Sequence, residues 1–530
     1  MAKSEQILLH NARIYASGEP DYSWMIFCPR NGTITSLGRE SPPLCDVTKD
    51  RQRDVGGKRV LPGLHEAHIH VSSIGQAQRG LDLHGCASIQ DFQNRIQKYV
   101  QSTPEDTELR GRGWEHDLLG RYPDRDDIDE VCDKRPISLI RACGHIRVVN
   151  TVALQLAGIT KDTPDPPGGV IDRYPDGHPK AGEPTGILRE KAQDLYRSEI
   201  TPSDEEIMEC IKAGINTCLK NGCTAVHSNE PATWRQWCTL AERGELPIRV
   251  FLAAYYTVRD SGNFPTPGER HGDMLSCDRI KLFADGSMGG STAAISLPYV
   301  GTTMQYGVPI YSQEEMTELV RDATARGFRL EIHVIGDRAA DLALTALEQA
   351  KVKPEMRPIL NHCQILRPDL VARMKKQGVV ANVQPQFVCT DSTWIHQRVP
   401  EELLGYAYAW KSLLQNGIPC AGGSDAPVEA PEPLLGIYDA IYRPVGNRDP
   451  DNQKVFRPEE CLSVQEALDL YTKGGAYATK RESDLGQLKP GYRADFVVLE
   501  KGPDVCQHPR HFRQVKVDEV WVDGKLKFSR

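Results

Sequence analysis

The 530-residue sequence has no apolar run that approaches the roughly 18 residues of a membrane-spanning helix. It also has no run of basic residues, and its net charge of -8 provides no positive surface for a nucleic acid or an acidic membrane. No CxxC pair occurs among its 15 cysteines, and the N-terminus MAKSEQILLHNARIY lacks the charged-then-apolar pattern of a signal peptide. We therefore expect a cytoplasmic protein with reduced thiols that binds a small molecule and neither nucleic acid nor membrane. The oligomeric state is open, and a homodimer is one arrangement we consider.

Strand-like apolar runs alternate with helical patterns from about residue 200 onward, as in parallel βα units. The candidate strands are residues 61–68, 222–228, 248–255, 279–286, 328–336, 357–363, 379–385 and 418–425. Eight such runs separated by helical stretches predict an α/β protein built on a closed TIM-type (β/α)8 barrel.

Two regions fall outside this alternation. Residues 76–200 are too long for a crossover after the first strand, so they predict an inserted subdomain that acts as a lid. Residues 1–58 and 484–530 contain short β-rich runs that need each other to form a stable sheet, and we expect a small composite β-sandwich. The barrel is then assigned to residues 59–75 and 201–483.

The first barrel strand ends in His68-Ile69-His70. Because side chains alternate along a strand, the two histidines share a face, which gives half of a metal site. A hydrogen-bonded surface pair is the alternative for this motif alone. His65 lies three residues before His68 and is expected on the opposite face, so we exclude it as a ligand.

Four later strands also place a polar residue near the C-terminal end, where barrel active sites lie. These residues are Lys281, His333, His362 and Asp425. Each residue also has a purely structural alternative. Lys281 could be a core lysine paired with Asp285, either histidine could be hydrogen-bonded within its strand, and Asp425 could cap a helix. Their joint placement favours metal binding, because it completes the ligand inventory of a metal hydrolase.

Aromatic and histidine side chains in the insertion and after the seventh strand are candidates for substrate contact. They are Trp114, His116, His145, Phe387 and Trp394. Core packing is the alternative for Trp114, a loop hydrogen bond for His145, and ordinary loop packing for Phe387 and Trp394. Asp285 and Asp337 begin βα loops and are expected to be caps or network residues.

Several motifs in one order resemble the amidohydrolase superfamily, specifically its family 3 (YtcJ-like) branch, which includes N-substituted formamide deformylases. The resemblance covers nearly the whole chain. Its carriers are PGLHEAHIH (62–70), GRGWEHD (111–117), GHIRVVN (144–150), IKLFADGSMGGSTAA (280–294), HVIGDRAAD (333–341), NHCQILRPD (361–369), NVQPQF (382–387), AGGSDAPVEAPEPLLGI (421–437) and LGQLKPGYRADFVVL (485–499). Two neighbours of the histidines depart from the family: Glu66 stands where members usually have Asp, and Asn361 where they usually have Glu. Both changes leave the ligands in place and alter what surrounds them.

The resemblance implies that Lys281 is carboxylated and bridges two metals. One metal would be held by His68, His70 and Asp425, and the other by His333 and His362. Zinc is expected from imidazole and carboxylate ligands, and manganese and iron remain alternatives. A single metal held by His68, His70, His333 and Asp425 is the other arrangement, with His362 left for substrate.

We expect a hydrolase of non-peptide carbon–nitrogen bonds, acting on a linear amide such as an N-substituted formamide or an acylated amine. A metal-activated hydroxide would attack the carbonyl, and Asp425 would carry the proton to the leaving nitrogen. The alternatives are cyclic-amide hydrolysis, decarboxylation or isomerisation on the same barrel, because fold does not set function. A non-catalytic interaction protein is a further alternative, against which the full ligand set argues.

Overall fold

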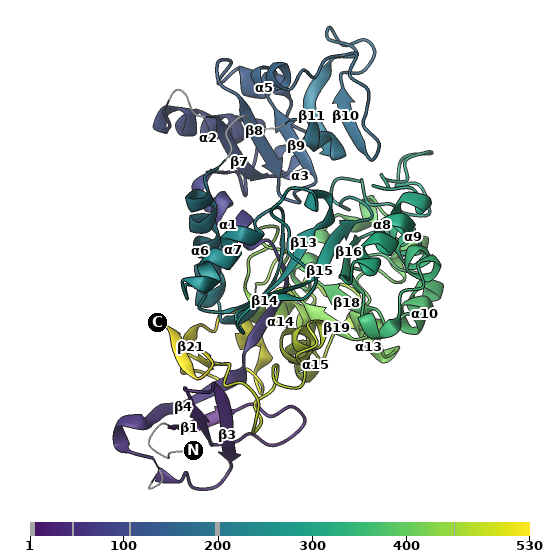
Figure 1. The fold of residues 1–530 in the computed structure, drawn as a ribbon. Helices are drawn as coiled ribbons and strands as arrows, with labels where there is room; N and C mark the ends of the chain where they lie inside the picture. Colours follow the sequence, from purple (N-terminus) through teal and green to yellow (C-terminus); the bar gives the residue numbers. More distant parts are fainter. Residues whose placement is uncertain (1–5, 45–46, 105–107, 197–201, 450) are drawn as a thin grey trace.

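The computed structural model describes residues 6–44, 47–104, 108–196, 202–449 and 451–530. It contains a parallel barrel, an inserted sheet above it and a mixed sheet at its foot (Figure 1). No helix in these ranges combines the length and apolarity that crossing a membrane requires. Each cysteine that the structure describes is a free thiol.

The barrel contains eight parallel strands, and all eight fall where the sequence predicts them. They are β5 (Leu64–Ile69), β12 (Cys223–Glu230), β13 (Arg249–Tyr255), β15 (Leu275–Phe283), β16 (Arg329–Val334), β17 (Ile359–His362), β18 (Val380–Val383) and β19 (Cys420–Gly422). Backbone hydrogen bonds beyond β19 close the seam to β5. Asp425 N donates to His68 O at 2.8 Å, and His70 N donates to Ala426 O at 2.9 Å. The seam therefore brings the first and last predicted ligand segments together.

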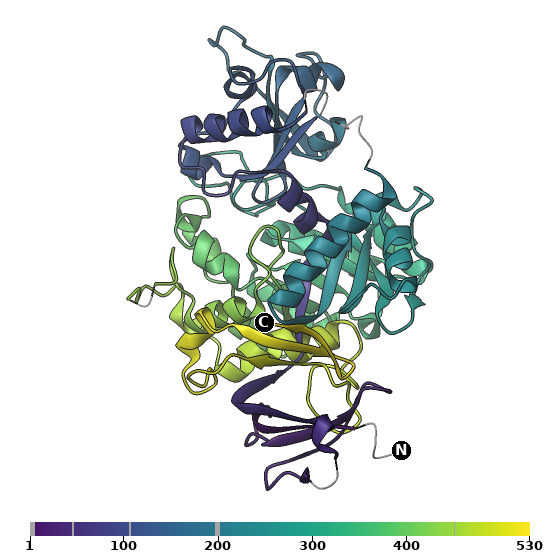
Figure 2. The ribbon, with the colours of Figure 1, turned by 90° about the vertical axis from the view of Figure 1, so that its left-hand side faces the viewer.

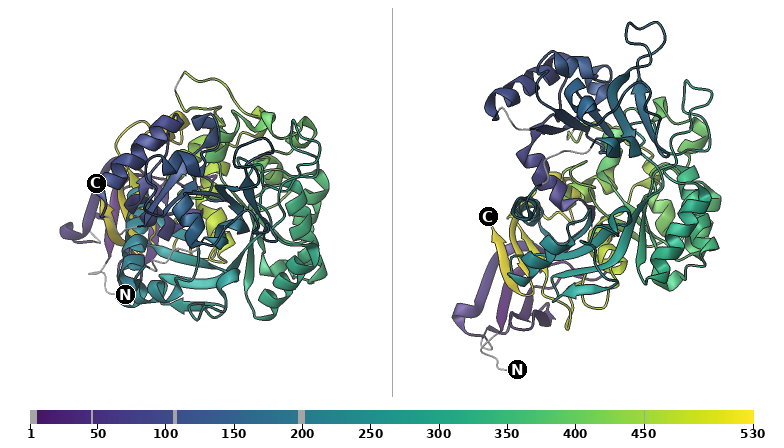
Figure 3. Two further views of the ribbon diagram at one scale, coloured as in Figure 1. Left: turned by 90° about the horizontal axis from the view of Figure 1, so that it is seen from above. Right: turned by 45° about the horizontal axis from the view of Figure 1, so that its top comes forward.

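Helices surround the barrel strands (Figures 1 and 3). They include α1 (Val71–Arg79), α6 (Asp204–Lys220), α7 (Trp234–Glu242), α8 (Gln313–Ala325), α9 (Asp337–Gln349), α10 (Pro368–Lys376), α11 (Gln386–Asp391), α13 (Trp410–Gln415), α14 (Pro433–Tyr442) and α15 (Val464–Asp469). Two of the long helices, α6 and α8, begin after a serine that forms a capping box, which satisfies free backbone amides of the first turn. Ser203 Oγ accepts from Glu206 N at 3.2 Å, and Ser312 Oγ accepts from Glu315 N at 3.2 Å.

The insertion after α1 has its own six-stranded sheet and lies over the barrel when seen from above (Figure 3). Its strands are β6 (Leu81–Asp82), β7 (Leu109–Trp114), β8 (Ile137–Arg141), β9 (Ile146–Val149), β10 (Gly169–Arg173) and β11 (Pro184–Glu190), with helices α2 (Ile89–Ser102), α4 (Arg125–Asp129) and α5 (Thr151–Leu156). Phe92 of α2 and Leu139 of β8 belong to a hydrophobic core separate from that of the barrel. This separate core lets the insertion form a body distinct from the barrel.

The expected pairing of the two termini is confirmed, and their strands form one seven-stranded mixed sheet where a small sandwich was expected (Figure 2). Its strands are β1 (Ile7–Ile14), β2 (Trp24–Cys28), β3 (Thr33–Gly38), β4 (Gln52–Pro62), β20 (Phe496–Leu499), β21 (Val517–Val522) and β22 (Lys525–Ser529). Antiparallel pairing of β20 with β4 joins the ends, with Phe496 opposite Pro62. The rings of Phe27, Phe496 and Trp521 pack with centroids 5.4 to 5.6 Å apart. Because β4 leads directly into β5, this sheet anchors the strand that carries His68 and His70.

Candidate metal centre

The two histidines at the end of β5 converge on Asp425. Nε2 of His68 lies 3.3 Å from Asp425 Oδ1, and Nε2 of His70 lies 3.1 Å from the same oxygen. Strand alternation puts both imidazoles on the inner face of the barrel, and the closed seam places Asp425 beside them. The structure thus brings together the first set of predicted ligands.

The other ring nitrogen of each of these histidines contacts a buried partner. His68 Nδ1 lies 3.2 Å from Glu331 Oε1, and His70 Nδ1 lies 2.9 Å from the carbonyl oxygen of Asn229. Tyr255 Oη is 3.1 Å from the same His70 nitrogen. Such contacts fix ring orientation and leave Nε2 free to face a metal.

His362 has the same arrangement. Its Nδ1 lies 2.8 Å from Gln384 Oε1, while its buried Nε2 has no hydrogen-bond partner among the described residues. One donor atom each from His68, His362 and Asp425 all lie within 4.8 Å of one another. A buried nitrogen lone pair without a donor is costly unless a ligand satisfies it, so this atom fits a metal site.

His333 and Lys281 complete the cluster. The His333 ring lies 4.4 Å from that of His362, with its Nε2 held by Gly286 O at 3.0 Å, which leaves Nδ1 as the available donor. Lys281 Nζ lies 3.4 Å from His68 Nε2. All six predicted ligands therefore gather at one end of the barrel.

Burial sets the protonation of these groups. It holds the pKa of His333 and of His362 well below the usual value, so both imidazoles are neutral and have lone pairs for ligation. Burial likewise lowers the pKa of Lys281 to about 8, against the opposing attraction of Glu331 and Asp425. The donor set of neutral imidazoles and one carboxylate, beside a lysine whose amine loses its proton more readily than usual, fits a divalent metal.

Glu331 is the main site residue that the sequence analysis missed. It is fully buried, and its Oε2 pairs with Arg279 Nη1 at 3.1 Å. Asn229 and Asn361 both donate to its Oε1, at 2.8 and 3.0 Å. A signal existed: Glu331 stands two residues before His333 on the same strand, so alternation places both side chains inside the barrel.

The two departures from the family pattern have distinct surroundings. Asn361 supports Glu331 through the hydrogen bond just described. Glu66 is fully buried and accepts from Ser424 N at 2.5 Å, and burial raises its pKa to about 8. Glu66 therefore ties β5 to the loop that carries Asp425.

Two cavities, each of about 360 Å³, meet at the cluster and are walled partly by the insertion. Both are lined by Cys143, His145, His333 and Asp425. His145 Nδ1 contacts Glu190 Oε2 at 2.7 Å. Although burial opposes it, this ion pair raises the pKa of His145 to about 9, so a charged imidazole faces the centre.

The remaining candidates for substrate contact are divided by the structure. Phe387 and Trp394 line one of the cavities, and Phe387 stacks on His362 at a centroid distance of 6.2 Å. Trp114 does not line either cavity: it is fully buried in the core of the insertion and donates from Nε1 to Leu139 O at 2.9 Å. His116 lines neither cavity, and its Nδ1 accepts a hydrogen bond from Arg141 Nε at 3.3 Å.

The two loop aspartates are network residues, as expected. Asp285 accepts from the backbone amides of Ala294, Ile335 and Gly336 at 2.8 to 3.0 Å. Asp337 accepts from Ser296 N at 2.9 Å. His65, excluded as a ligand, is buried, contacts His227 at 3.3 Å and takes no part in the cluster.

Comparisons with known proteins agree with this geometry. A family model described as "Amidohydrolase family" matches residues 52–528. The Bacillus subtilis protein "Putative amidohydrolase YtcJ" is 32% identical over 486 residues, covering 90% of each chain. The N-substituted formamide deformylase of Arthrobacter pascens is 26% identical over 555 residues, covering 100% of this chain and 99% of that one. The crystal structure of an uncharacterized metal-dependent hydrolase from Pyrococcus furiosus superposes with a TM-score of 0.71 at 28% identity, covering 94% and 99% of the two chains. The chain belongs to the amidohydrolase family and is a metal-dependent hydrolase of that family.

Proposed function

We propose that this protein hydrolyses the carbon–nitrogen bond of a small linear amide, such as an N-substituted formamide or an acylated amine. The observation that carries the proposal is the convergence of His68 and His70 on Asp425, beside the unpartnered Nε2 of His362. Similarity to the formamide deformylase of Arthrobacter pascens over the full chain supports this bond class.

The metal would be held by His68, His70 and Asp425, with His333, His362 and Lys281 available for a second ion, and zinc suits these donors. A divalent metal at these ligands lowers the pKa of a bound water and polarises a carbonyl. The residues of the chain hold the ligands in place and exclude bulk solvent, since nearly all of this cluster is buried.

Asp425 has the position of a proton carrier. Its carboxylate contacts both histidines of β5, and the residue lines both cavities. Burial opposes ionisation, but the neighbouring histidines hold its pKa well below the usual range. It therefore starts as an acceptor for the proton of the attacking water and can return that proton to the leaving nitrogen, a role typically worth about 10²- to 10⁴-fold in rate.

His145 would orient the substrate. Its Nδ1 faces Glu190, so Nε2 of the charged ring is the donor available to a substrate oxygen. Because His145 comes from the insertion, substrate binding would require the insertion and the barrel together.

Lys281 would accept carbon dioxide on its neutral amine. The amine nitrogen would form an N–C bond as one C=O π bond of carbon dioxide breaks toward oxygen, and the nitrogen would then lose one proton to give a carbamate. Counted from the ammonium, two protons are released and a repelling cation becomes a carboxylate ligand. The lowered pKa of Lys281, about 8, makes the neutral amine accessible near neutral pH.

A substrate screen tests this proposal. Purified protein reconstituted with zinc and bicarbonate would be given N-substituted formamides, N-acyl amines and cyclic amides, with metal-stripped protein and Asp425→Asn as matched blanks. We expect turnover of a linear amide that is absent without metal and at least about 10²-fold slower in Asp425→Asn. Turnover of cyclic amides alone, or of no amide by a metal-loaded enzyme, would contradict the proposed reaction.

A further inference from the structure

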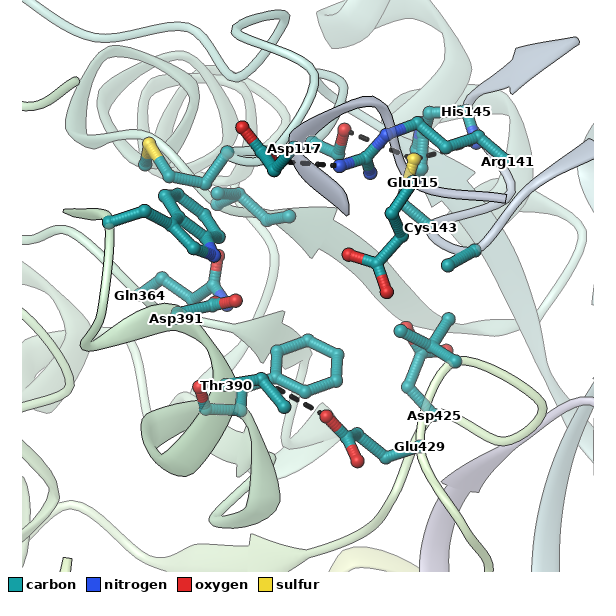
Figure 4. Close-up of a pocket in the computed structure, with 18 of the residues that line it drawn as sticks. Glu115, Asp117, Arg141, Cys143, His145, Gln364, Thr390, Asp391, Asp425 and Glu429 are labelled. Carbon is teal, nitrogen blue, oxygen red and sulfur yellow. Dashed lines mark hydrogen bonds and ion pairs between the residues drawn. The ribbon is translucent and has the colours of Figure 1, made fainter. Parts of the chain in front are cut away.

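One of the two cavities beside the metal centre has an acidic wall. Glu115 enters it from the insertion, Asp391 from the end of α11 and Glu429 from the loop after β19, so three separate segments supply carboxylates (Figure 4). Phe387 and Trp394 form apolar parts of the same wall. This combination suits an organic group with a positive charge.

Two basic side chains, Arg141 and His145, also line this cavity, and each pairs with a carboxylate other than these three; His145 pairs with Glu190 at 2.7 Å. Arg141 Nη2 lies 3.8 Å from Asp117 Oδ2, and Arg398 Nη2 lies 2.5 Å from Asp117 Oδ1, so two guanidinium groups share one carboxylate. Among the residues that the structure describes, no lysine, arginine or histidine lies within ion-pair distance of Glu115, Asp391 or Glu429. Among the described residues, these three carboxylates therefore form no close ion pair, and Arg141, Arg398 and Arg448 attract them only from a longer distance.

An uncharged acceptor points to the same kind of ligand. Gln364 is 3% exposed and lines this cavity, and its Oε1 has no hydrogen-bond partner in the described chain. Its Nε2 contacts Asp391 Oδ2 at 3.4 Å, which places the free acceptor beside that carboxylate. A buried acceptor without a donor is costly, so an N–H group of a ligand would satisfy it.

The pKa values of two carboxyl groups in this cavity also favour a cationic ligand. Burial raises the pKa of Asp391 to about 7 and that of Glu429 to about 8. Thr390 Oγ1 donates to Glu429 Oε1 at 3.0 Å, and Tyr408 Oη donates to Asp391 Oδ2 at 2.7 Å. Burial outweighs the lowering of the pKa of Glu429 by Arg448 and of the pKa of Asp391 by Arg141 and Arg398. A bound cation would stabilise both groups as anions.

The acidic wall is continuous with the metal centre, because Asp425 and His333 line the same cavity. Figure 4 shows Asp425 and Glu429 entering from one loop, with Asp391 and Gln364 across the space from them. An amide held at Asp425 can therefore extend a substituent toward the three carboxylates. The cavity volume of about 360 Å³ lies in the range of small-molecule sites.

We propose that this cavity binds a cationic nitrogen group of the substrate, an ammonium or guanidinium, through Glu115, Asp391, Glu429 and the free acceptor of Gln364. The enzyme would then prefer amides whose substituent ends in a positive charge over uncharged amides of the same shape. This inference deepens the proposed function by naming a substrate class, and it rests on that function only for turnover.

Binding can be measured without turnover. Calorimetric titration of the zinc-loaded protein would compare n-butylguanidinium with n-butylurea, which has nearly the same shape but no charge. Guanidinium keeps its proton at neutral pH, so it does not compete as a metal ligand. We expect the guanidinium to bind at least about tenfold more tightly, as charged hydrogen bonds in a buried site require.

Variants of the acidic residues test whether they cause the preference for the guanidinium probe. Glu429→Gln and Asp391→Asn should each reduce the ratio of the two affinities several-fold, while both probes still bind. Glu402→Gln is the matched control, since Glu402 is exposed on α12 (Glu401–Leu404) and the substitution makes the same change in charge. Equal affinity for the two probes in the unaltered protein, or a preference that survives in both cavity variants, would overturn the proposal.

Turnover separates this proposal from the proposed function. N-formyl-1,5-diaminopentane and N-formylpentylamine differ only in the terminal ammonium, and kcat/KM should favour the charged amide by about tenfold or more. Faster turnover of the uncharged amide contradicts the cation site. If neither amide is cleaved while the guanidinium preference holds, the cation site stands and the proposed reaction fails.

Discussion

Glu331 Oε1 lies 3.2 Å from Nδ1 of His68, and this contact joins the metal centre to a buried polar network beneath it. The opposite oxygen of the same carboxylate pairs with Arg279 at 3.1 Å. Burial opposes the charge of Glu331, but Arg279 and His68 hold its pKa well below the usual value. A negative charge is thereby fixed behind a ligand, where it orients the imidazole and makes it more basic.

Replacing Glu331 should therefore weaken metal binding without removing a ligand. Glu331→Gln is expected to lower metal affinity by about 10- to 100-fold, the usual effect of losing such an outer contact. Competition with a chromophoric chelator measures this affinity.

The same change leaves Arg279 buried without its counter-charge, which also reduces stability. The double variant Glu331→Gln, Arg279→Gln should regain stability but not metal affinity. If the double variant binds metal as tightly as the unaltered protein, Glu331 serves only to neutralise Arg279.

Lys281 carboxylation predicts a dependence on bicarbonate. Protein reconstituted with zinc and bicarbonate should hold about two metals per chain, as in two-metal sites, and be more active than protein reconstituted without bicarbonate. Native mass spectrometry should show the added mass of one carbon dioxide, lost in Lys281→Arg, which keeps the charge but cannot become the carboxylate. Full activity with one metal and unmodified Lys281 would support the mononuclear arrangement instead.

The terminal sheet should transmit a defect between the two ends of the chain. Phe496→Ala removes a fully buried ring between Phe27 and Trp521 and should cost about 3 to 5 kcal/mol. Hydrogen exchange should then accelerate in β4 as well as in β20, because the two strands pair. Lys525→Ala on the exposed edge is the control. Unchanged protection of β4 would show that the N-terminal strands are stable without β20.

Much of the fold and of the metal centre could be predicted from the sequence, and the reason is geometric. The strand ends of a parallel barrel converge, so polar residues spread from position 68 to position 425 meet once their strands are recognised. No comparable geometric rule predicts which side chains of the insertion reach the cavities. Trp114 and Glu115 are adjacent, yet the tryptophan packs into the core of the insertion while the glutamate lines the cavity.

The polar network beneath the ligands also escaped the sequence analysis, although its positions were available. Tyr255 ends β13 and Glu331 precedes His333 by two residues, so both follow from strand alternation once the strand boundaries are known. Their partners could not be found that way. The pairing of Glu331 with His68 joins residues 263 positions apart, and only the closed barrel brings them into contact.

The most direct test of the account is the metal content and turnover of Asp425→Asn, measured side by side. Asparagine keeps an oxygen beside His68 and His70 but cannot accept a proton, so zinc content should fall modestly while turnover of the amide falls by about 10²-fold or more. His68→Ala, which removes a ligand, should lose zinc and activity together. Near-normal turnover in Asp425→Asn would contradict the account, since the proton would then be carried by another residue.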